Sequence, residues 1–98
     1  MRRETAIAKL RENIDAVRAL GAVSLYIYGS TARGEAEPGS DLDVFVEYDP
    51  GGRFSLIDLA GIKVLLEEEL GIDVDVTTRD SLHPLLRNRI ERSAIRVF

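Results

Sequence analysis

The sequence predicts a small α/β (α+β) domain in which a mixed β-sheet is flanked by helices. Segments with apolar residues at helical spacing alternate along the chain with short segments of strand length. The chain has 98 residues, the size of one domain, and it contains no repeat, low-complexity tract or long linker. We therefore expect one domain over residues 1–98, with the element order α, β, short α, β, α, β, α.

The first half of the chain is expected to contain a long helix and two strands. Apolar residues recur every three or four positions over residues 4–20, and Gly21 can end that helix. Residues 23–28 form a β-branched and aromatic run of strand length. Residues 41–48 alternate in character, with Leu42, Val44 and Val46 on one face and Asp41, Asp43, Phe45 and Glu47 on the other. This alternation predicts a strand with one buried face.

The second half is expected to add a helix, a strand and another helix. Ser55 is a candidate N-cap of the second long helix, which Gly71 can end. A strand is predicted over residues 72–78, and a short last strand over residues 95–98. The third helix is predicted from Leu82, Leu85, Leu86 and Ile90, with Pro84 in its first turn. Three aromatic side chains are expected to pack around the sheet, or one of them to stack on a base: Tyr26, Tyr28 and Phe45.

Composition excludes several classes of function. The formal net charge is −4 and no basic run is present, so the charge pattern of a nucleic-acid-binding protein is missing. No cysteine is present, which excludes disulfides and thiolate zinc sites. The N-terminal segment is charged throughout and lacks the apolar stretch of a signal peptide or membrane span. We therefore expect a soluble cytoplasmic protein without direct contact to nucleic acid or membrane.

Two aspartates lie two residues apart in the predicted strand over residues 41–48. Residues two apart in a strand share a face and are separated by about 6.8 Å, so Asp41 and Asp43 can converge on one cation, most often magnesium where the substrate is a phosphate. The next strand places Asp73 and Asp75 on a single face, and spacing alone leaves open which of them joins the first pair. The same spacing is also common on the solvent face of an antiparallel sheet.

A Gly-Ser pair follows the first predicted strand. Gly29 ends the strand, and Ser30 is expected to be the N-cap of a short helical turn whose free backbone N–H groups and hydroxyl can hold an anion. Arg33, one turn further on, either reaches the phosphate or lies in solvent. No Gly-Lys-Ser/Thr follows, and the glycines do not match a dinucleotide fingerprint. The combination of a phosphate-binding turn, a ten-residue spacer and paired acids is more specific than any of its parts.

At these residues the sequence resembles a known family. Gly29-Ser30, ten further residues and Asp41-Leu42-Asp43 reproduce the GSx10DxD signature of the DNA polymerase β-like nucleotidyltransferases, and the rest of the chain is similar to their minimal members, the MNT proteins. The resemblance implies the polymerase β-like fold and a nucleotidyl transfer with ATP as co-substrate. It also implies a two-metal Mg²⁺ site held by three catalytic acids, with a nucleotide-binding turn beside it: Asp41, Asp43 and Asp75 for the metal, and Gly29, Ser30 and Arg33 for the nucleotide. The chain departs from the family at Asp73, where the family often has a basic or polar residue. The likeness over Val74-Asp75-Val76-Thr77 favours Asp75 as the third acid.

The same resemblance implies a protein partner. The minimal members are typically paired with a HEPN-type ribonuclease toxin and act as its antitoxin by transferring AMP to a tyrosine hydroxyl, so a hetero-oligomer is expected. Two other functions stay open. A small-molecule nucleotidyltransferase would use the same acids on a low-molecular-weight alcohol, and a non-catalytic antitoxin would mask its toxin by binding alone. A structural subunit whose acids hold an incidental cation is the plainest alternative.

Overall fold

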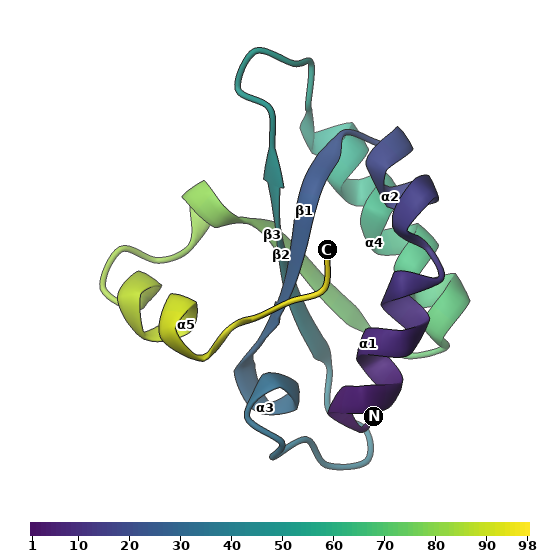
Figure 1. Cartoon of the computed structure of the whole chain (residues 1–98), viewed down its shortest axis with the longest axis vertical. Helices are drawn as coiled ribbons and strands as arrows, with labels where there is room; N and C mark the ends of the chain where they lie inside the picture. The colour runs from purple at the N-terminus through teal and green to yellow at the C-terminus, as the bar shows by residue number, and fades with distance from the viewer.

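A four-stranded mixed sheet forms the centre of the protein, described here for residues 1–98 by a computed structural model (Figure 1). Strands β1 (Ala22–Tyr28), β2 (Leu42–Tyr48), β3 (Val74–Thr78) and β4 (Ile95–Arg96) lie in the order β3-β2-β1-β4. Strand β1 is antiparallel to both β2 and β4, and β2 is parallel to β3. The predicted α/β (α+β) class, with a mixed sheet flanked by helices, is confirmed.

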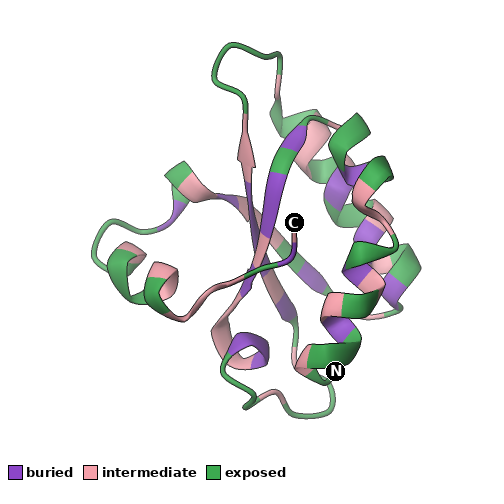
Figure 2. Cartoon of the chain, viewed as in Figure 1, coloured by how far each residue is buried: buried purple, intermediate pink, exposed green.

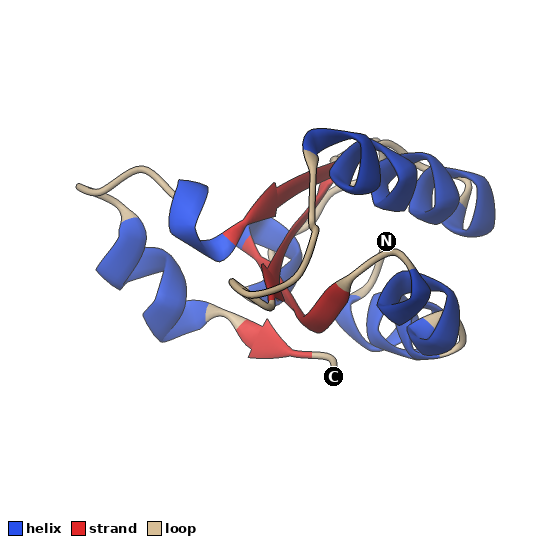
Figure 3. Cartoon of the chain, turned by 90° about the horizontal axis from the view of Figure 1, so that it is seen from above, coloured by secondary structure: helices blue, strands red, loops and turns tan.

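Three helices cover one face of this sheet: α1 (Arg3–Arg11), α2 (Ile14–Ala19) and α4 (Leu56–Leu70). They lie together on one side of the strands in Figures 1 and 3, and Figure 2 shows buried residues on the strands and on the helices that pack there. The side chains in this core include Ala6, Leu10, Val17, Leu25, Ile27, Leu42, Val44, Val46, Ile62, Leu66, Leu70 and Val74. Burial of their apolar surface is the main stabilising contribution to the fold.

The opposite face carries polar and aromatic side chains, and we call it the polar face: Ser24, Tyr26, Tyr28, Asp43, Phe45, Glu47, Asp75 and Thr77. The strand registers place these residues in three rows. Tyr28, Asp43 and Asp75 form the first row, Tyr26, Phe45 and Thr77 the second, and Ser24 and Glu47 the third. The short helix α3 (Gly29–Ala32) begins directly after the first row, and helix α5 (Arg87–Ser93) lies on the side of the sheet away from α1 and α4 (Figure 1).

The single long helix predicted over residues 4–20 is wrong, because the chain breaks it into α1 and α2. The break lies at Asn13, whose side-chain amide donates to the carbonyl of Lys9 at 3.0 Å while its backbone N–H donates to Leu10. In a continuous helix that carbonyl would accept from the backbone N–H of the asparagine. Its side chain donates there instead, and so competes with the helical hydrogen bond. Ala6, Leu10 and Val17 nevertheless reach the same core.

Both predicted ends of the second long helix are confirmed. The Ser55 hydroxyl accepts from the Asp58 backbone N–H, and the Asp58 carboxylate accepts in turn from the Ser55 N–H, which is a capping box at the start of α4. Gly71 ends α4 in the left-handed conformation, with a φ of 71°. None of the helices is both long and apolar enough to span a membrane.

The predicted third helix starts later than expected. Residues Arg79–Ser81 form a 3-10 turn, η1, and Pro84 lies in an irregular turn ahead of α5 rather than in the helix. His83 stabilises that turn, because its carbonyl accepts from the Leu86 N–H at 2.9 Å and its Nδ1 accepts from the Leu85 N–H at 3.2 Å. The predicted last strand is present as β4, which pairs with β1.

Candidate active site

Asp43 and Asp75 are direct neighbours across the parallel pair of strands β2 and β3. Adjacent strands lie about 4.8 Å apart and residues in register share a face, so both carboxylates belong to the polar face. Helix α4 fixes the start of β3 beside them, since Lys63 donates to the Val74 carbonyl at 2.6 Å and Glu67 accepts from the Val74 N–H at 3.1 Å. The structure thus brings together two of the three predicted acids.

Asp41 lies just outside the strand that was expected to contain it. Strand β2 begins at Leu42, whose N–H donates to the carbonyl of Asp73, so Asp41 and Asp73 both precede their strands and both are exposed. The two residues also line one cavity of about 420 Å³ between the loop before β2 and the end of α4. The charge of Asp41 nonetheless contributes to the raised pKa of Asp43.

Burial and the two neighbouring acids raise the pKa of Asp43. Desolvation of the carboxylate is the largest cause, and the charges of Asp75 and Asp41 follow. Asp73 does not contribute, which favours Asp75 over Asp73 as the third member of the acidic group. None of Asp41, Asp43 and Asp75 forms an ion pair with a basic side chain. Carboxylates without an ion-pair partner fit a hard cation such as Mg²⁺.

The three acids do not form a closed metal site in the side-chain conformations of the structure. No group of three acidic or histidine side chains is placed to hold an ion. Asp41 and Asp75 are both exposed, and exposed side chains change rotamer quickly. Binding of a cation by all three would therefore need one or both of these carboxylates to turn toward Asp43.

Gly29 brings the backbone into contact with Asp43. Its φ is +71°, and a Cβ at this position would lie 2.5 Å from Oδ2 of Asp43. Any side chain here would therefore both strain the backbone and displace the carboxylate. The Gly-Ser turn and the acids, separated by ten residues in the sequence, form one site because only glycine allows this approach.

The prediction that Ser30 is the N-cap of the short helix is wrong. Helix α3 begins at Gly29, whose carbonyl already accepts from the Arg33 N–H at 3.2 Å, and the cap position falls on Tyr28. Ser30 lies in the first turn and is partly buried, and its carbonyl accepts from the Glu35 N–H at 2.8 Å. Its hydroxyl has no partner among the described hydrogen bonds, so it is free to contact a ligand.

Arg33 lies at the C-terminal end of α3. The sequence allows it either to contact the phosphate or to lie in solvent. Its side chain is exposed and pairs with Glu35 at 3.2 Å. Its charge still lowers the pKa of Asp43, against the effects of burial and the neighbouring acids. An exposed ion pair of this kind contributes only about 0–1 kcal/mol, so Arg33 can leave Glu35 for a phosphate at little cost.

Aromatic side chains form the part of the polar face next to the acids. Tyr26 stacks on the buried Phe45 with ring centroids 4.8 Å apart, and Tyr28 packs against the same ring at 5.7 Å. Burial, and then the charges of Asp43 and Asp75, raise the pKa of Tyr28 to about 12. The phenol of Tyr28 is therefore a neutral group beside the acids at ordinary pH.

Arg79 links the polar face to α5. Its guanidinium lies over the rings of Tyr26 and Phe45, pairs with Glu47 at 3.3 Å and donates to Glu91 of α5 through Nε at 2.8 Å. Ser24 completes the group by donating to Glu47 at 2.7 Å. These contacts hold α5 beside the sheet, although α5 itself has no buried residue.

Tyr28 packs against Phe45 on the sheet, as expected, but its position beside the acids and the position of Arg79 were not predicted. Alternation along the first strand could have found Tyr28, since Leu25 and Ile27 are core residues and their neighbours must face the other way. Arg79 follows Asp75 and Thr77 at the same spacing of two residues, which predicts that it lies on the same face of the sheet. The pattern carried both signals, but both residue types also have common structural roles.

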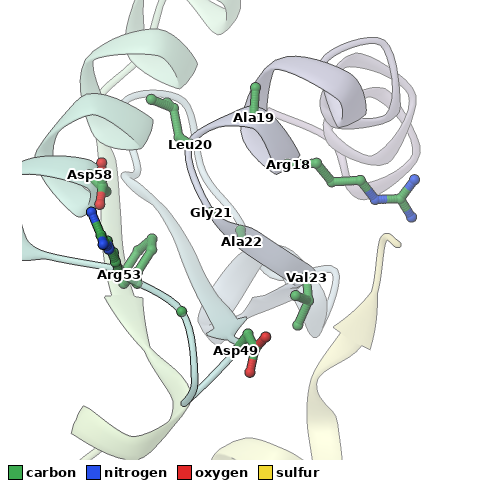
Figure 4. Close-up of a pocket in the computed structure, with 11 residues that line it drawn as sticks. Arg18, Ala19, Leu20, Gly21, Ala22, Val23, Asp49, Arg53 and Asp58 are labelled. Carbon is green, nitrogen blue, oxygen red and sulfur yellow. The ribbon is translucent and has the colours of Figure 1, made fainter.

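The largest cavity lies away from the acids, at the opposite end of β1 (Figure 4). It measures about 650 Å³ and is lined by residues of the α2–β1 turn and the β2–α4 loop, among them Arg18, Leu20, Val23, Asp49, Arg53 and Asp58. Arg18 and Asp58 come from opposite sides of it in Figure 4. None of the predicted site residues lines this cavity.

Comparison of the sequence with known proteins identifies the family of the chain. Residues 10–97 match the model of the nucleotidyltransferase domain family. The chain is 49% identical over 72 residues to a Methanocaldococcus jannaschii protein provisionally named a protein adenylyltransferase, covering 74% of this chain and 75% of that protein. It is 32% identical over 77 residues to the protein adenylyltransferase MntA of Thermococcus cleftensis, covering 79% of this chain and 76% of that one.

Solved structures show the same fold. A structure provisionally described as a minimal nucleotidyltransferase superposes with a TM-score of 0.82 at 39% identity, over 97% of this chain and 95% of that one. A chain of a Shewanella oneidensis complex between a tri-AMPylated HEPN toxin and its MNT antitoxin superposes with a TM-score of 0.63 at 18% identity, over 90% of this chain and 68% of that one. With the signature residues gathered at one site, these matches show that the chain is a nucleotidyltransferase and belongs to the nucleotidyltransferase domain family, among its minimal members.

Proposed function

We propose that this nucleotidyltransferase is metal-dependent and moves AMP from ATP to a tyrosine hydroxyl of a HEPN-type ribonuclease toxin, as the antitoxin of that toxin. The observation that carries the proposal is the pairing of Asp43 with Asp75 next to Gly29. Two acids without an ion-pair partner lie beside a turn that can take a phosphate. That is the combination a nucleotidyl transfer needs.

Each predicted residue has a role in this proposal. Asp41, Asp43 and Asp75 hold Mg²⁺, which when bound neutralises charge on the reacting phosphates. Gly29 allows the nucleotide to approach the backbone, and Ser30 contacts the β- and γ-phosphates. Arg33 leaves its exposed pairing with Glu35 and adds a positive charge to the same phosphates.

The transfer itself exchanges one bond to phosphorus for another. The acceptor oxygen forms a bond to the α-phosphorus of ATP as the bond from that phosphorus to the pyrophosphate oxygen breaks. Pyrophosphate leaves with the electron pair, and the acceptor keeps AMP as a phosphodiester. The proton of the acceptor hydroxyl passes to the carboxylate of Asp75, which is exposed and so can be reached from the surface of another protein.

The choice of a protein acceptor is supported by the relatives. The curated relatives of M. jannaschii and T. cleftensis carry the name protein adenylyltransferase. Two of the solved structures are toxin–antitoxin complexes, one with AMP-PNP and one with an AMPylated HEPN toxin, and they share the fold of this chain at 20% and 18% identity. ATP as co-substrate is supported by the same AMP-PNP complex.

The direct test is a transfer assay. The purified chain is incubated with Mg²⁺, ATP labelled in the α-phosphate, and the protein encoded by the neighbouring gene. We expect label on that protein, with the mass of AMP added to a tyrosine by mass spectrometry. A label found only on a small alcohol would support the small-molecule alternative instead.

A second experiment separates chemistry from masking. The toxin is treated with this chain and ATP, the two proteins are separated, and ribonuclease activity is measured. Modification predicts that inhibition persists, whereas masking predicts recovery on dilution below the dissociation constant. The double variant Ser30→Ala/Asp41→Asn is expected to fold and to lose transfer, and Asp15→Asn, an exposed acid of α2, is the control for the change in charge. If the double variant protects toxin-expressing cells as well as wild type at matched expression, the catalytic proposal is wrong.

A further inference from the structure

We propose that the exposed side chains of residues 83–96 form a docking surface for an acidic, partly apolar face of the acceptor protein, an inference that rests on the proposed protein acceptor. We call this surface the basic arm, and its residues are His83, Leu85, Leu86, Arg89, Arg92 and Arg96. It comprises the turn before α5, exposed residues of α5, and the end of β4. Three observations carry the proposal: exposed leucines, unpaired arginines and the position of α5.

The arm exposes apolar surface that the fold does not use. Leu85 and Leu86 are 87% and 45% exposed, and they are adjacent in the turn before α5. Helix α5 itself contains no buried residue, and Figure 2 shows it with exposed and intermediate residues only. Exposed apolar side chains with charged residues around them are a feature of protein–protein contacts.

The charge of this part of the chain is opposite to that of the rest. Residues 79–98 contain five basic and two acidic residues, whereas residues 1–78 contain eight basic and fifteen acidic residues. Both acids of the basic segment are already engaged, Glu91 by Arg79 and Arg87 and Asp80 by Tyr48 and Thr78. Arg89, Arg92 and Arg96 form no ion pair, so an acidic partner would supply the carboxylates that they lack.

The arm adjoins the site at which transfer is proposed. Arg79 ties α5 to Glu47 of β2, and Arg96 lies over the ring of Tyr26 at 5.9 Å, in the row next to Asp43 and Asp75. An acidic partner is attracted to the arm and repelled by the acidic remainder of the chain, which fixes its orientation. Docking there would hold an acceptor hydroxyl beside the acids.

Binding is tested with the protein encoded by the neighbouring gene, as the candidate acceptor, by isothermal titration calorimetry without ATP at low and high salt. We expect Arg89→Glu/Arg92→Glu to weaken binding at least about tenfold at low salt, because opposite charges are replaced by like charges. The wild-type affinity should fall with salt. Leu85→Ser should weaken binding by a similar factor at both salt concentrations. Arg18→Glu/Arg53→Glu makes the same change of charge at the distant cavity of Figure 4 and should stay within about twofold of wild type.

The docking surface would be wrong if the arm variants bound as tightly as wild type, or if the control and arm variants lost affinity equally. It would also be wrong if the wild-type chain did not bind at all. A dimer of this chain that the arm variants dissociate would assign the surface to self-association instead. The substituted residues are exposed, and circular dichroism with thermal melting checks that each variant folds. A wild-type chain that binds through the arm without transferring AMP contradicts the proposed function only. A wild-type chain that transfers AMP while arm variants bind normally contradicts the docking surface only.

Discussion

Asp43 of β2 and Asp75 of β3 are neighbours across the parallel strands, and no basic side chain is paired with either of them. Like charges held together in a partly buried place raise the free energy of the folded protein. A bound cation would remove that repulsion. The relationship therefore links stability to metal binding, and variants at this pair should change the two in opposite directions.

Asp43→Asn is expected to stabilise the metal-free protein and to abolish transfer. Because the folded protein raises the pKa of Asp43, the ionised carboxylate costs stability at neutral pH, and that cost disappears as the pH falls below the ordinary carboxyl value of 3.8. The side chain is partly exposed, so the gain should stay below about 1 kcal/mol. Transfer should fall by a factor of about 100 or more.

Thermal melting in the presence of a chelator measures the first effect. The melting temperature of Asp43→Asn should exceed that of wild type at neutral pH and equal it in acid. Wild-type rates of transfer by this variant with Mg²⁺ would show that Asp43 is not a metal ligand.

Asp75→Ala and Asp73→Ala should differ sharply although the residues are two apart. Asp75 lies opposite Asp43 and acts on its pKa, whereas Asp73 precedes the strand and does not. We expect Asp75→Ala to lose transfer by a factor of about 100 or more and to retain much of its ATP binding, while Asp73→Ala stays within a few-fold of wild type. Equilibrium binding of ATP and initial rates of transfer separate the two effects. The reverse pattern would assign the third acid to Asp73.

Gly29→Ala should damage the site, whereas Gly34→Ala should not. The two glycines have nearly the same φ, +71° and +73°, but a Cβ at Gly29 meets the Asp43 carboxylate and a Cβ at Gly34 meets nothing within 4 Å. Both variants should lose about 1 kcal/mol to backbone strain. Only Gly29→Ala should also lose transfer, because it moves Asp43.

Chemical denaturation and transfer assays on the two glycine variants provide the comparison. Equal loss of transfer in both would mean that backbone strain, and not contact with Asp43, accounts for the glycine at this turn.

The sequence predicted those features that depend on short-range chemistry. Ser55 and Gly71 end α4 as expected, because caps are set by residues within one turn. Alternation placed Asp43 and Phe45 opposite the core residues of β2. The break at Asn13 and the late start of α5 were missed, since each depends on one side chain taking a particular hydrogen-bond partner.

The arrangement of the site could not be predicted without the order and register of the strands. Spacing put Asp73 and Asp75 on one face but could not say which of them would lie opposite Asp43, because that depends on strand register. The contact of Gly29 with Asp43 likewise joins segments that are separated in the sequence. Resemblance to the family favoured Asp75, and the register of β2 and β3 now supplies a physical reason.

Tyr28→Phe is expected to keep transfer within about threefold of wild type and to keep its pH profile. The phenol lies in the same row as Asp43 and Asp75, where a base or an acceptor hydroxyl would also be useful, so its position alone does not decide its role. Burial, and then the charges of Asp43 and Asp75, raise its pKa to about 12, which favours a phenol that stays protonated at ordinary pH. A phenol that stays protonated does not take the proton of the acceptor hydroxyl, the step that we propose for Asp75.

The ring of Tyr28 should contribute to the stability of the fold, whereas its hydroxyl should contribute little to transfer. Tyr28→Ala removes the packing against Phe45 and is expected to lower the free energy of unfolding by about 1–2 kcal/mol, less than for a fully buried aromatic. Tyr26→Phe, one row away on the same strand, is the control for loss of a hydroxyl from the polar face. Rates of transfer across the pH range decide between the roles. A large loss of rate in Tyr28→Phe but not in Tyr26→Phe, or a shift of the basic limb of its profile, would give the phenol of Tyr28 a part in the proton transfer.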